Sequence, residues 1–286
     1  MKVALALGGG AARGYAHLGV IKVLQREGVR IDIVTGTSIG SLIGAMYAST
    51  GDIYRVIEKL ISFVRSDHFK ETEIDFFNEM RRSSHQGFLK KLGYFFRQGY
   101  ALTYSLTRES LVSRDRYFKS IEMLVEDKRI EDFPIRFATV AVDLVTGEKI
   151  KLTEGSARFA VAASSAIPGF LPPVIDGERL LADGGWIENV PVALAREMGA
   201  DFVIAVDLNG KLEKSPPLDN GLNVLLRSDD IARYYLKNFY LRDADILLQP
   251  DVSDIFWADF RHIEKGIMKG EEEAEKKIRA ILSRVS

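Results

Sequence analysis

The fold of this chain is decided by residues 31–48, which read IDIVTGTSIGSLIGAMYA. The run Ile31–Val34 is short and largely apolar, which is typical of a buried strand, and residues 41–48 have the small and apolar character of a helix packed on a sheet. Between them lies Gly36-Thr-Ser-Ile-Gly40, which fits the pattern G-x-S-x-G. A serine on a tight strand-to-helix turn is exposed at the carboxyl edge of a sheet. The stretch therefore predicts an α/β fold with Ser38 as a candidate nucleophile, the alternative being a serine that merely caps the helix.

Short apolar runs alternate with helical segments along the rest of the chain. Further strands are expected at Val3–Leu7, Ile135–Val142, Phe202–Val206 and Ile246–Leu248. Such runs, separated by helices, predict a three-layer α/β sandwich with a mostly parallel central sheet.

A length of 286 residues fits one domain, expected over residues 3–250. Residues 251–286 are expected to form a C-terminal amphipathic helix packed on the core, because apolar residues recur there at helical spacing. These residues are Ile263, Ile267, Ala274, Ile278 and Ile281.

Composition and charge exclude several classes of protein. Lys and Arg number 39 and Asp and Glu 40, so the net charge of -1 gives no field that would collect nucleic acid. The absence of cysteine excludes disulfides, a thiolate nucleophile and cysteine-ligated metals. Four scattered histidines without a His-x-x-x-His pair argue against a histidine metal site, so we expect chemistry without a metal or cofactor. No apolar run approaches the ~20 residues that cross a bilayer, so we expect a cytoplasmic enzyme, peripheral at the membrane if it touches one.

The second motif is a glycine-rich loop, Gly8-Gly-Gly-Ala-Ala-Arg-Gly14, directly after the first expected strand. Residues without bulky side chains can turn several backbone N–H groups toward one oxygen, which is the geometry of an oxyanion hole. The competing hypothesis is a phosphate cradle for a nucleotide. It fails in detail, because Arg13 stands where the dinucleotide fingerprint needs glycine, and Tyr15-Ala16 stand where a P-loop needs Lys and Ser or Thr.

Several acids follow expected strands and compete to be the partner of Ser38. Asp183 precedes two glycines, which places a carboxylate on a tight turn at a sheet edge, although an Asp-Gly turn without chemistry is the ordinary reading of such a pair. Asp143 and Asp207 also follow apolar runs, and Asp251 comes shortly after the last one. Asp143 looks like a hairpin residue. Position alone does not choose among these acids.

Together these motifs resemble one known family. The two glycine-containing motifs, Ala163-Ser-Ser-Ala-Ile-Pro-Gly169 with Pro172-Pro-Val174, and Asp183-Gly-Gly185 occur in the order seen in bacterial patatin-like phospholipases. The resemblance runs from residue 3 to about residue 250. It implies a patatin-like fold and a serine acyl hydrolase with a dyad of Ser38 and Asp183, acting on esters of phospholipids or lysophospholipids. It also implies an oxyanion hole formed by Gly8, Gly9, Gly10, Ala11, Ala12, Arg13 and Ile39.

Several points stay open within this mechanism. An unperturbed Asp has a pKa of ~3.9 and is a poor base for an alcohol, so a dyad needs burial to raise the pKa of Asp183. The alternative is a Ser-Asp-His triad, for which His262 alone comes late enough in the chain, whereas His17 is expected to be structural. Arg13 could bind a lipid phosphate, but an ion pair that fixes the loop is the expected role. A non-catalytic lipid-binding or regulatory protein on the same fold is the alternative function, and an intact Ser38 and Asp183 argue against it.

Residues 66–116 interrupt the α/β alternation and are expected to form a helical cap or lid insertion. Within them, residues 87–108 carry only basic charges among many aromatic rings. The residues concerned are Lys90, Lys91, Arg97, Arg108, Phe88, Tyr94, Phe95, Phe96, Tyr100 and Tyr104. Aromatic rings bury at the headgroup level while cations meet anionic lipid, so this segment is expected to contact a membrane peripherally. The alternative is a packed cap whose aromatic rings face the core.

Overall fold

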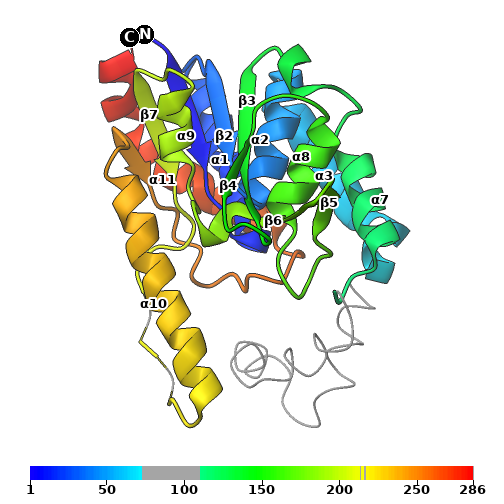
Figure 1. Cartoon of the computed structure of the whole chain (residues 1–286). Helices are drawn as coiled ribbons and strands as arrows, with labels where there is room; N and C mark the ends of the chain where they lie inside the picture. Colours follow the sequence, from blue (N-terminus) through cyan, green and yellow to red (C-terminus); the bar gives the residue numbers. More distant parts are fainter. Residues whose placement is uncertain (73–109, 213, 216, 286) are drawn as a thin grey trace.

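The computed structural model describes residues 1–72, 110–212, 214–215 and 217–285. Its strands form a central sheet with helices on both faces, which confirms the predicted three-layer α/β fold (Figure 1). The strands are β1 (Val3–Leu7), β2 (Ile33–Gly36), β3 (Arg136–Asp143), β4 (Lys149–Leu152), β5 (Val174–Asp176), β6 (Arg179–Asp183), β7 (Phe202–Val206) and β8 (Ile246–Leu248). The helices are α1 (Tyr15–Arg26), α2 (Ile39–Thr50), α3 (Ile53–Arg65), α7 (Arg114–Leu124), α8 (Ala157–Ser165), α9 (Val192–Glu197), α10 (Gly221–Leu241) and α11 (Ile263–Val285). Short 3-10 helices are η1 (Ala11–Gly14), η2 (Ile130–Asp132) and η3 (Gly184–Trp186).

The sheet is parallel at its centre. Its strand order is β5-β6-β3-β2-β1-β7-β8, and β4 also pairs with β3. The strands β3, β2, β1, β7 and β8 are mutually parallel, whereas β4 and β6 run antiparallel to β3, and β5 runs antiparallel to β6. Parallel neighbours need crossover connections, so helices cover the sheet and the loops after β1 and β2 meet at one edge.

Two apolar layers hold the helices on the sheet. On one face, Leu5 and Leu7 of β1 belong to a core that includes residues of α1, α2, α3, α8 and α11. On the other face, Ala4 and Ala6 pack with α9 and with Leu241 at the end of α10. Side chains alternate across a strand, so β1 is buried on both faces, and this explains why its sequence is a continuous apolar run.

The observed strand boundaries follow the sequence pattern in β7 and β8 and differ from it in β2. The first two begin and end where their apolar runs do. The strand predicted at residues 31–34 is observed at Ile33–Gly36, so it continues into the serine motif. Asp32 explains the later start, because its carboxylate accepts the N–H of Val3 at 3.0 Å and the regular pairing begins with Ala4 opposite Ile33.

The C-terminal helix packs against α1 through glycine residues. Helix α11 begins at Ile263, and residues 251–262 form turns and irregular structure before it. A Cβ atom on Gly19 would overlap Ile267 O, and one on Gly270 would overlap Ala16 O. Glycine at these positions therefore allows the two helix backbones to approach closely.

The span predicted as a cap, residues 66–116, begins directly after α3 and includes the first residues of α7. Helix α3 ends at Arg65, and α7 begins at Arg114 and contacts α3 and α8. Residues 73–109, which contain the whole 87–108 segment, lie outside the described residues. In the part of the chain that is described, none of the helices combines the length and apolar character that a bilayer crossing requires.

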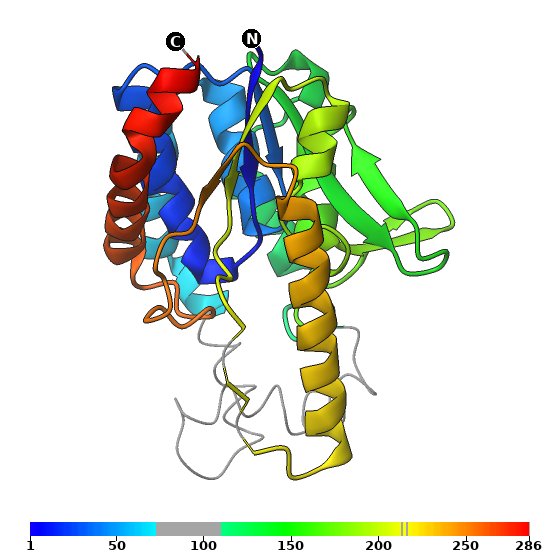
Figure 2. The ribbon, with the colours of Figure 1, turned by 90° about the vertical axis from the view of Figure 1, so that its left-hand side faces the viewer.

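Helix α10 lies between β7 and β8, where the alternation of apolar runs predicts a helical segment without giving its bounds or its length. It extends past the carboxyl ends of the central strands in both views (Figure 1, Figure 2). A buried ion pair anchors it, with Lys237 Nζ 2.7 Å from Asp207 Oδ2 just after β7. The helix therefore flanks the sheet edge that carries the glycine loop and the serine motif.

Candidate active site

Three sequence motifs meet at the carboxyl edge of the parallel strands. The glycine loop follows β1, and Ser38 follows β2, whose last residue pairs with Leu7. Asp183 ends β6 and pairs with Ala141 near the end of β3. Strands β1, β2 and β3 are neighbours in the sheet, so the fold brings segments that are far apart in the sequence to one place (Figure 1).

Ser38 lies on a strained turn, for which the flanking glycines provide the space. Its φ of 57° and ψ of -126° are unusual for a residue with a Cβ atom, and Ala11 is the other described non-glycine residue with a positive φ. A Cβ on Gly36 would overlap Gly40 O, and one on Gly40 would overlap Leu7 O. Backbone strain of this kind clusters at functional sites, where the surrounding structure holds it in place.

The hydroxyl of Ser38 lies close enough to the carboxylate of Asp183 to influence the pKa of that group. The N–H of Gly185 donates a hydrogen bond to Asp183 Oδ1 at 2.7 Å. Ser38 is 6% exposed and Asp183 is 3% exposed, so both lie in the interior. Burial raises the pKa of Asp183 to about 6, against the lowering effects of Ser38, of the Gly185 N–H and of the Arg233 charge. The carboxylate is therefore a better proton acceptor near neutral pH than an exposed Asp.

The other candidate acids have different partners. Asp143, Asp207 and Asp251 accept hydrogen bonds from Thr146 Oγ1, Lys237 Nζ and Ser253 Oγ, at 2.8, 2.7 and 2.7 Å respectively. Asp143 also accepts the N–H of Val145, so it is the hairpin residue that the sequence predicts. Asp183, in contrast, lies close enough to the Ser38 hydroxyl to be influenced by it. Among the described residues, no group of three or more His, Cys, Asp or Glu side chains is arranged to hold a metal ion.

The two histidines considered in the sequence analysis, His17 and His262, have described contacts with groups other than Ser38. The side chain of His262 is 50% exposed, and its Nε2 lies 3.3 Å from Asp259 Oδ2, which gives no support to a triad. His17 is buried, with Nε2 2.7 Å from Gly8 O, and its Nδ1 has no hydrogen-bond partner among the described residues. Burial lowers the pKa of His17 to about 4, so the ring is neutral at pH 7. It anchors the glycine loop, in agreement with the structural role expected of it.

The glycine loop presents fewer backbone donors than its sequence suggests. Four of its N–H groups already donate to protein carbonyls: Gly8 to Val206, Gly9 to Asn189, Ala12 to Trp257 and Arg13 to Gly10, at 3.0, 3.0, 2.8 and 3.2 Å. In the described structure, the N–H groups of Gly10, Ala11 and Ile39 have no such acceptor. The loop lies against the serine, because a Cβ on Gly9 would be 3.3 Å from Ser38 Cβ. The candidate oxyanion hole therefore narrows to Gly10, Ala11 and Ile39.

Side chains from distant segments hold this loop in place. Arg13 Nε donates to Ile255 O at 3.0 Å, so this residue fixes the loop to the segment before α11. Asn209 Nδ2, shortly after β7, donates to Gly9 O at 2.9 Å. The sequence gives no signal for Asn209, because it belongs to no motif and follows an ordinary buried strand.

Helix α10 adds a cation near the carboxylate. The guanidinium carbon of Arg233 lies 5.2 Å from the centre of the Trp186 ring, three residues after Asp183. The same guanidinium pairs with Asp229 and Asp230 of its own helix. Its charge lowers the pKa of Asp183, in opposition to burial. Nothing in the sequence pattern links this helix to the site.

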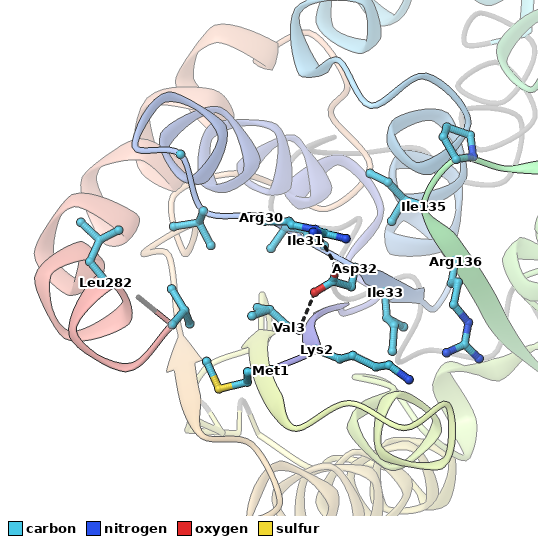
Figure 3. Close-up of a pocket in the computed structure, with 14 residues that line it drawn as sticks. Met1, Lys2, Val3, Arg30, Ile31, Asp32, Ile33, Ile135, Arg136 and Leu282 are labelled. Atoms are coloured by element: carbon cyan, nitrogen blue, oxygen red, sulfur yellow. Dashed lines mark hydrogen bonds and ion pairs between the residues drawn. The ribbon is translucent and has the colours of Figure 1, made fainter.

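A cavity lies at the opposite edge of the sheet (Figure 3). Its lining includes Val3, Ile33 and Arg136, at the amino ends of β1, β2 and β3. Asp32 there accepts the N–H of Val3 and pairs with Arg30. Ser38 follows the carboxyl end of β2, so this cavity is separate from the Ser38 site.

Comparison with known proteins defines what kind of protein this is. The chain is an α/β protein with a serine on a strand-to-helix turn at the carboxyl edge of a mostly parallel sheet. The family model described as patatin-like phospholipase matches residues 5–196, which is more than half of the chain. The chain therefore belongs to the patatin-like phospholipase family.

Individual relatives agree with this family. The chain is 35% identical over 214 residues to Patatin-like phospholipase domain-containing protein 6 of Mus musculus, and the match covers 74% of the chain and 14% of that protein. It is 32% identical over 219 residues to Lysophospholipase NTE1 of Yarrowia lipolytica, covering 77% of the chain and 13% of that protein. The chain thus spans about one seventh of the length of these curated relatives. Both relatives are eukaryotic, so they do not support the bacterial part of the resemblance.

A solved structure shares the fold. The crystal structure of VipD from Legionella pneumophila matches with a TM-score of 0.51 and 14% sequence identity. The match covers 98% of this chain and 67% of that chain. At this level of identity the likeness concerns the arrangement of strands and helices.

Proposed function

We propose that this chain hydrolyses carboxylic esters of lipids, with Ser38 as the nucleophile and Asp183 as its proton acceptor. The observation that carries the proposal is the juxtaposition of Ser38, on its strained turn, with a buried carboxylate whose pKa burial raises to about 6. In this proposal Asp183 takes the proton of the hydroxyl directly, so no histidine is required. Family membership, and the names phospholipase and lysophospholipase carried by the relatives, support a lipid ester as the substrate.

The proposed reaction has two acyl-transfer steps. Ser38 Oγ attacks the ester carbonyl carbon, its proton passes to Asp183, and the carbonyl oxygen becomes an oxyanion. Collapse of this tetrahedral intermediate breaks the bond to the alcohol oxygen, which takes the proton from Asp183 and leaves an acyl-serine. Water then attacks the acyl carbon and gives a proton to Asp183. The second collapse releases the fatty acid, and that proton returns to Ser38 Oγ.

The oxyanion in both steps needs donors that are already in place. We assign this role to the N–H groups of Gly10, Ala11 and Ile39, because the other N–H groups of the loop donate to protein carbonyls. The N-terminus of α2 adds the positive end of its dipole at Ser38. Donors of this kind contribute on the order of 10²–10³ in kcat each.

Replacement of Ser38 tests the proposal. Wild-type protein should hydrolyse nitrophenyl butyrate and release fatty acid from lysophosphatidylcholine and phosphatidylcholine, and the ratio of the two lipid rates distinguishes a lysophospholipase from a phospholipase. Ser38→Ala should do neither while its thermal unfolding matches that of the wild type. Retained turnover by Ser38→Ala would overturn the assignment of the nucleophile. Lipid binding by the wild type without any turnover would instead favour the non-catalytic lipid-binding alternative.

We also propose, from sequence composition, that residues 87–108 contact anionic membranes. Each basic residue near such a surface contributes on the order of 1 kcal/mol, so Lys90→Glu with Lys91→Glu should weaken binding to phosphatidylserine vesicles in a sedimentation assay. The matched control changes the adjacent pair Lys276 and Lys277 of α11 to Glu. Equal binding by the two double variants would contradict the proposal and favour a packed cap.

A further inference from the structure

The motif Ala163-Ser-Ser-Ala-Ile-Pro-Gly169 has no role in the chemistry described above, yet it contacts the nucleophile. Ser164 and Ser165 are the last two residues of α8, and they lie 126 and 127 residues after Ser38 in the sequence. The N–H of Ser38 donates to Ser164 Oγ at 3.1 Å. The hydroxyl of Ser165 donates to Ser38 O, also at 3.1 Å. Two consecutive side chains thus hold the two polar backbone groups of one residue.

The conformation of Ser38 explains why it needs external partners. Its φ of 57° and ψ of -126° belong to neither a strand nor a helix, so neither structure supplies a partner for its buried N–H. The carbonyl also accepts the first hydrogen bond of α2, from Leu42 N at 3.1 Å. Strained backbone of this kind persists where the surroundings over-determine it. Ser164 and Ser165 lie outside the turn and supply hydrogen bonds that hold this conformation.

The same short segment also holds the second member of the dyad. Asp183 N–H donates to Ala166 O at 3.0 Å. Tyr117, on α7, donates its buried hydroxyl to Ala162 O at 2.6 Å, which fixes the last turn of α8 against the neighbouring helix. Residues 164–166 therefore set the backbone positions of Ser38 and Asp183 relative to each other.

We propose that Ser164 and Ser165 are positioning residues for the reaction. By holding the N–H and C=O of Ser38, they keep its Oγ close to Asp183 and its acyl group aligned with the proposed oxyanion hole. Loss of either hydroxyl lets the turn relax, and a small misplacement of a reacting atom costs rate without weakening substrate binding. This inference rests on the proposed function, since it assigns a role relative to the Ser38 nucleophile.

Steady-state kinetics of matched serine variants test the proposal. Ser164→Ala and Ser165→Ala should each lower kcat for nitrophenyl butyrate by about ten-fold to one hundred-fold, with KM within about two-fold of the wild type. Ser165→Thr keeps the hydroxyl at a half-buried position and should restore most of kcat. The control is Ser49→Ala, a buried serine at the far end of α2 whose hydroxyl donates to Met46 O within the same helix. It should retain wild-type kcat.

The outcomes separate positioning from a purely structural role. If Ser164→Ala loses a buried partner and unfolds, the half-buried Ser165→Ala still tests the inference. Wild-type kcat in Ser165→Ala, or a loss of kcat that Ser165→Thr does not restore, would overturn it. A parallel loss in Ser49→Ala would show that any deleted serine hydroxyl lowers the rate, and would also overturn it. An inactive wild-type protein would contradict the proposed function itself. An active wild-type protein with fully active Ala variants would contradict only the positioning role.

Discussion

Replacement of Asp183 by Asn separates the chemical and structural consequences of burying this carboxylate. The amide has nearly the same shape, and its oxygen can still accept the N–H of Gly185, but it is no practical proton acceptor at neutral pH. We expect kcat to fall on the order of 10⁴-fold, as when the acid of a catalytic unit is replaced. In the wild type, kcat/KM should rise with pH through an acid limb near the pKa of about 6 that burial gives to Asp183.

The same replacement should stabilise the folded protein at neutral pH. Burial raises the pKa of Asp183 from 3.8 to about 6, so between these values the folded state retains a proton that the unfolded state has released. Below pH ~3.8, Asp183 therefore makes its full contribution to the free energy of unfolding. That contribution falls by about 3 kcal/mol as the pH rises through the pKa of Asp183 in the folded protein. Asn has no charge to bury, so the stability gain of Asp183→Asn should grow over this window and then level off above pH ~7.

Urea unfolding of both proteins between pH ~4 and ~8 measures this difference. Comparison of the two is necessary because His17 acts in the opposite direction. Burial lowers the pKa of His17 to about 4, so its contribution to stability is present above pH ~6.5 and is lost as pH falls. That contribution is common to both proteins and cancels in their difference. A difference that does not change with pH, together with retained activity in Asp183→Asn, would refute both the raised pKa and the proposed role.

Three further changes test separate parts of the account. His262→Ala should keep most of the esterase activity, because the dyad needs no histidine, and a large loss at unchanged thermal stability would restore the triad. Gly9→Ala places a Cβ 3.3 Å from Ser38 Cβ, so the rate with nitrophenyl butyrate should fall by about ten-fold or more, and an unchanged rate would contradict the close approach of the loop. Gly270→Ala forces α11 away from α1 and should lower stability by about 1–3 kcal/mol in thermal unfolding. Gly221→Ala, where a Cβ meets nothing within 4 Å, is its control, and equal stability of the two variants would contradict the packing described.

The architecture can be predicted from the sequence because strands and helices follow from local patterns of apolar residues. Strand β7 is fully buried and β8 is partly buried, and the apolar runs mark the ends of both strands correctly. The start of β2 is not local, because it depends on the carboxylate of Asp32 accepting the N–H of Val3 from a neighbouring strand. The position of helix α10 is not predicted, because its anchor depends on tertiary contacts of Lys237 with Asp207 and with the carbonyl of Gly210.

The candidate site is predicted in its residue types and less well in its hydrogen bonds. The proximity of Ser38 and Asp183 agrees with the motif order, although the catalytic roles of both residues stay predictions. The loop donors could not be sorted from sequence, since the acceptors Val206, Asn189 and Trp257 lie far along the chain and are chosen by the tertiary fold. The positive φ of Ala11 is likewise set by tertiary contacts, because alanine has no local preference for it.

The most direct test of the central claim is covalent labelling of the nucleophile with a fluorophosphonate probe, located by mass spectrometry. The probe transfers its phosphonyl group to an activated serine oxygen with loss of fluoride, so it reports nucleophilicity without requiring the natural lipid. We predict stoichiometric labelling on the peptide that contains Ser38 and much slower labelling of Asp183→Asn at pH ~8. Labelling at a different residue, or no labelling of a preparation that hydrolyses esters, would contradict the assignment of Ser38 and Asp183.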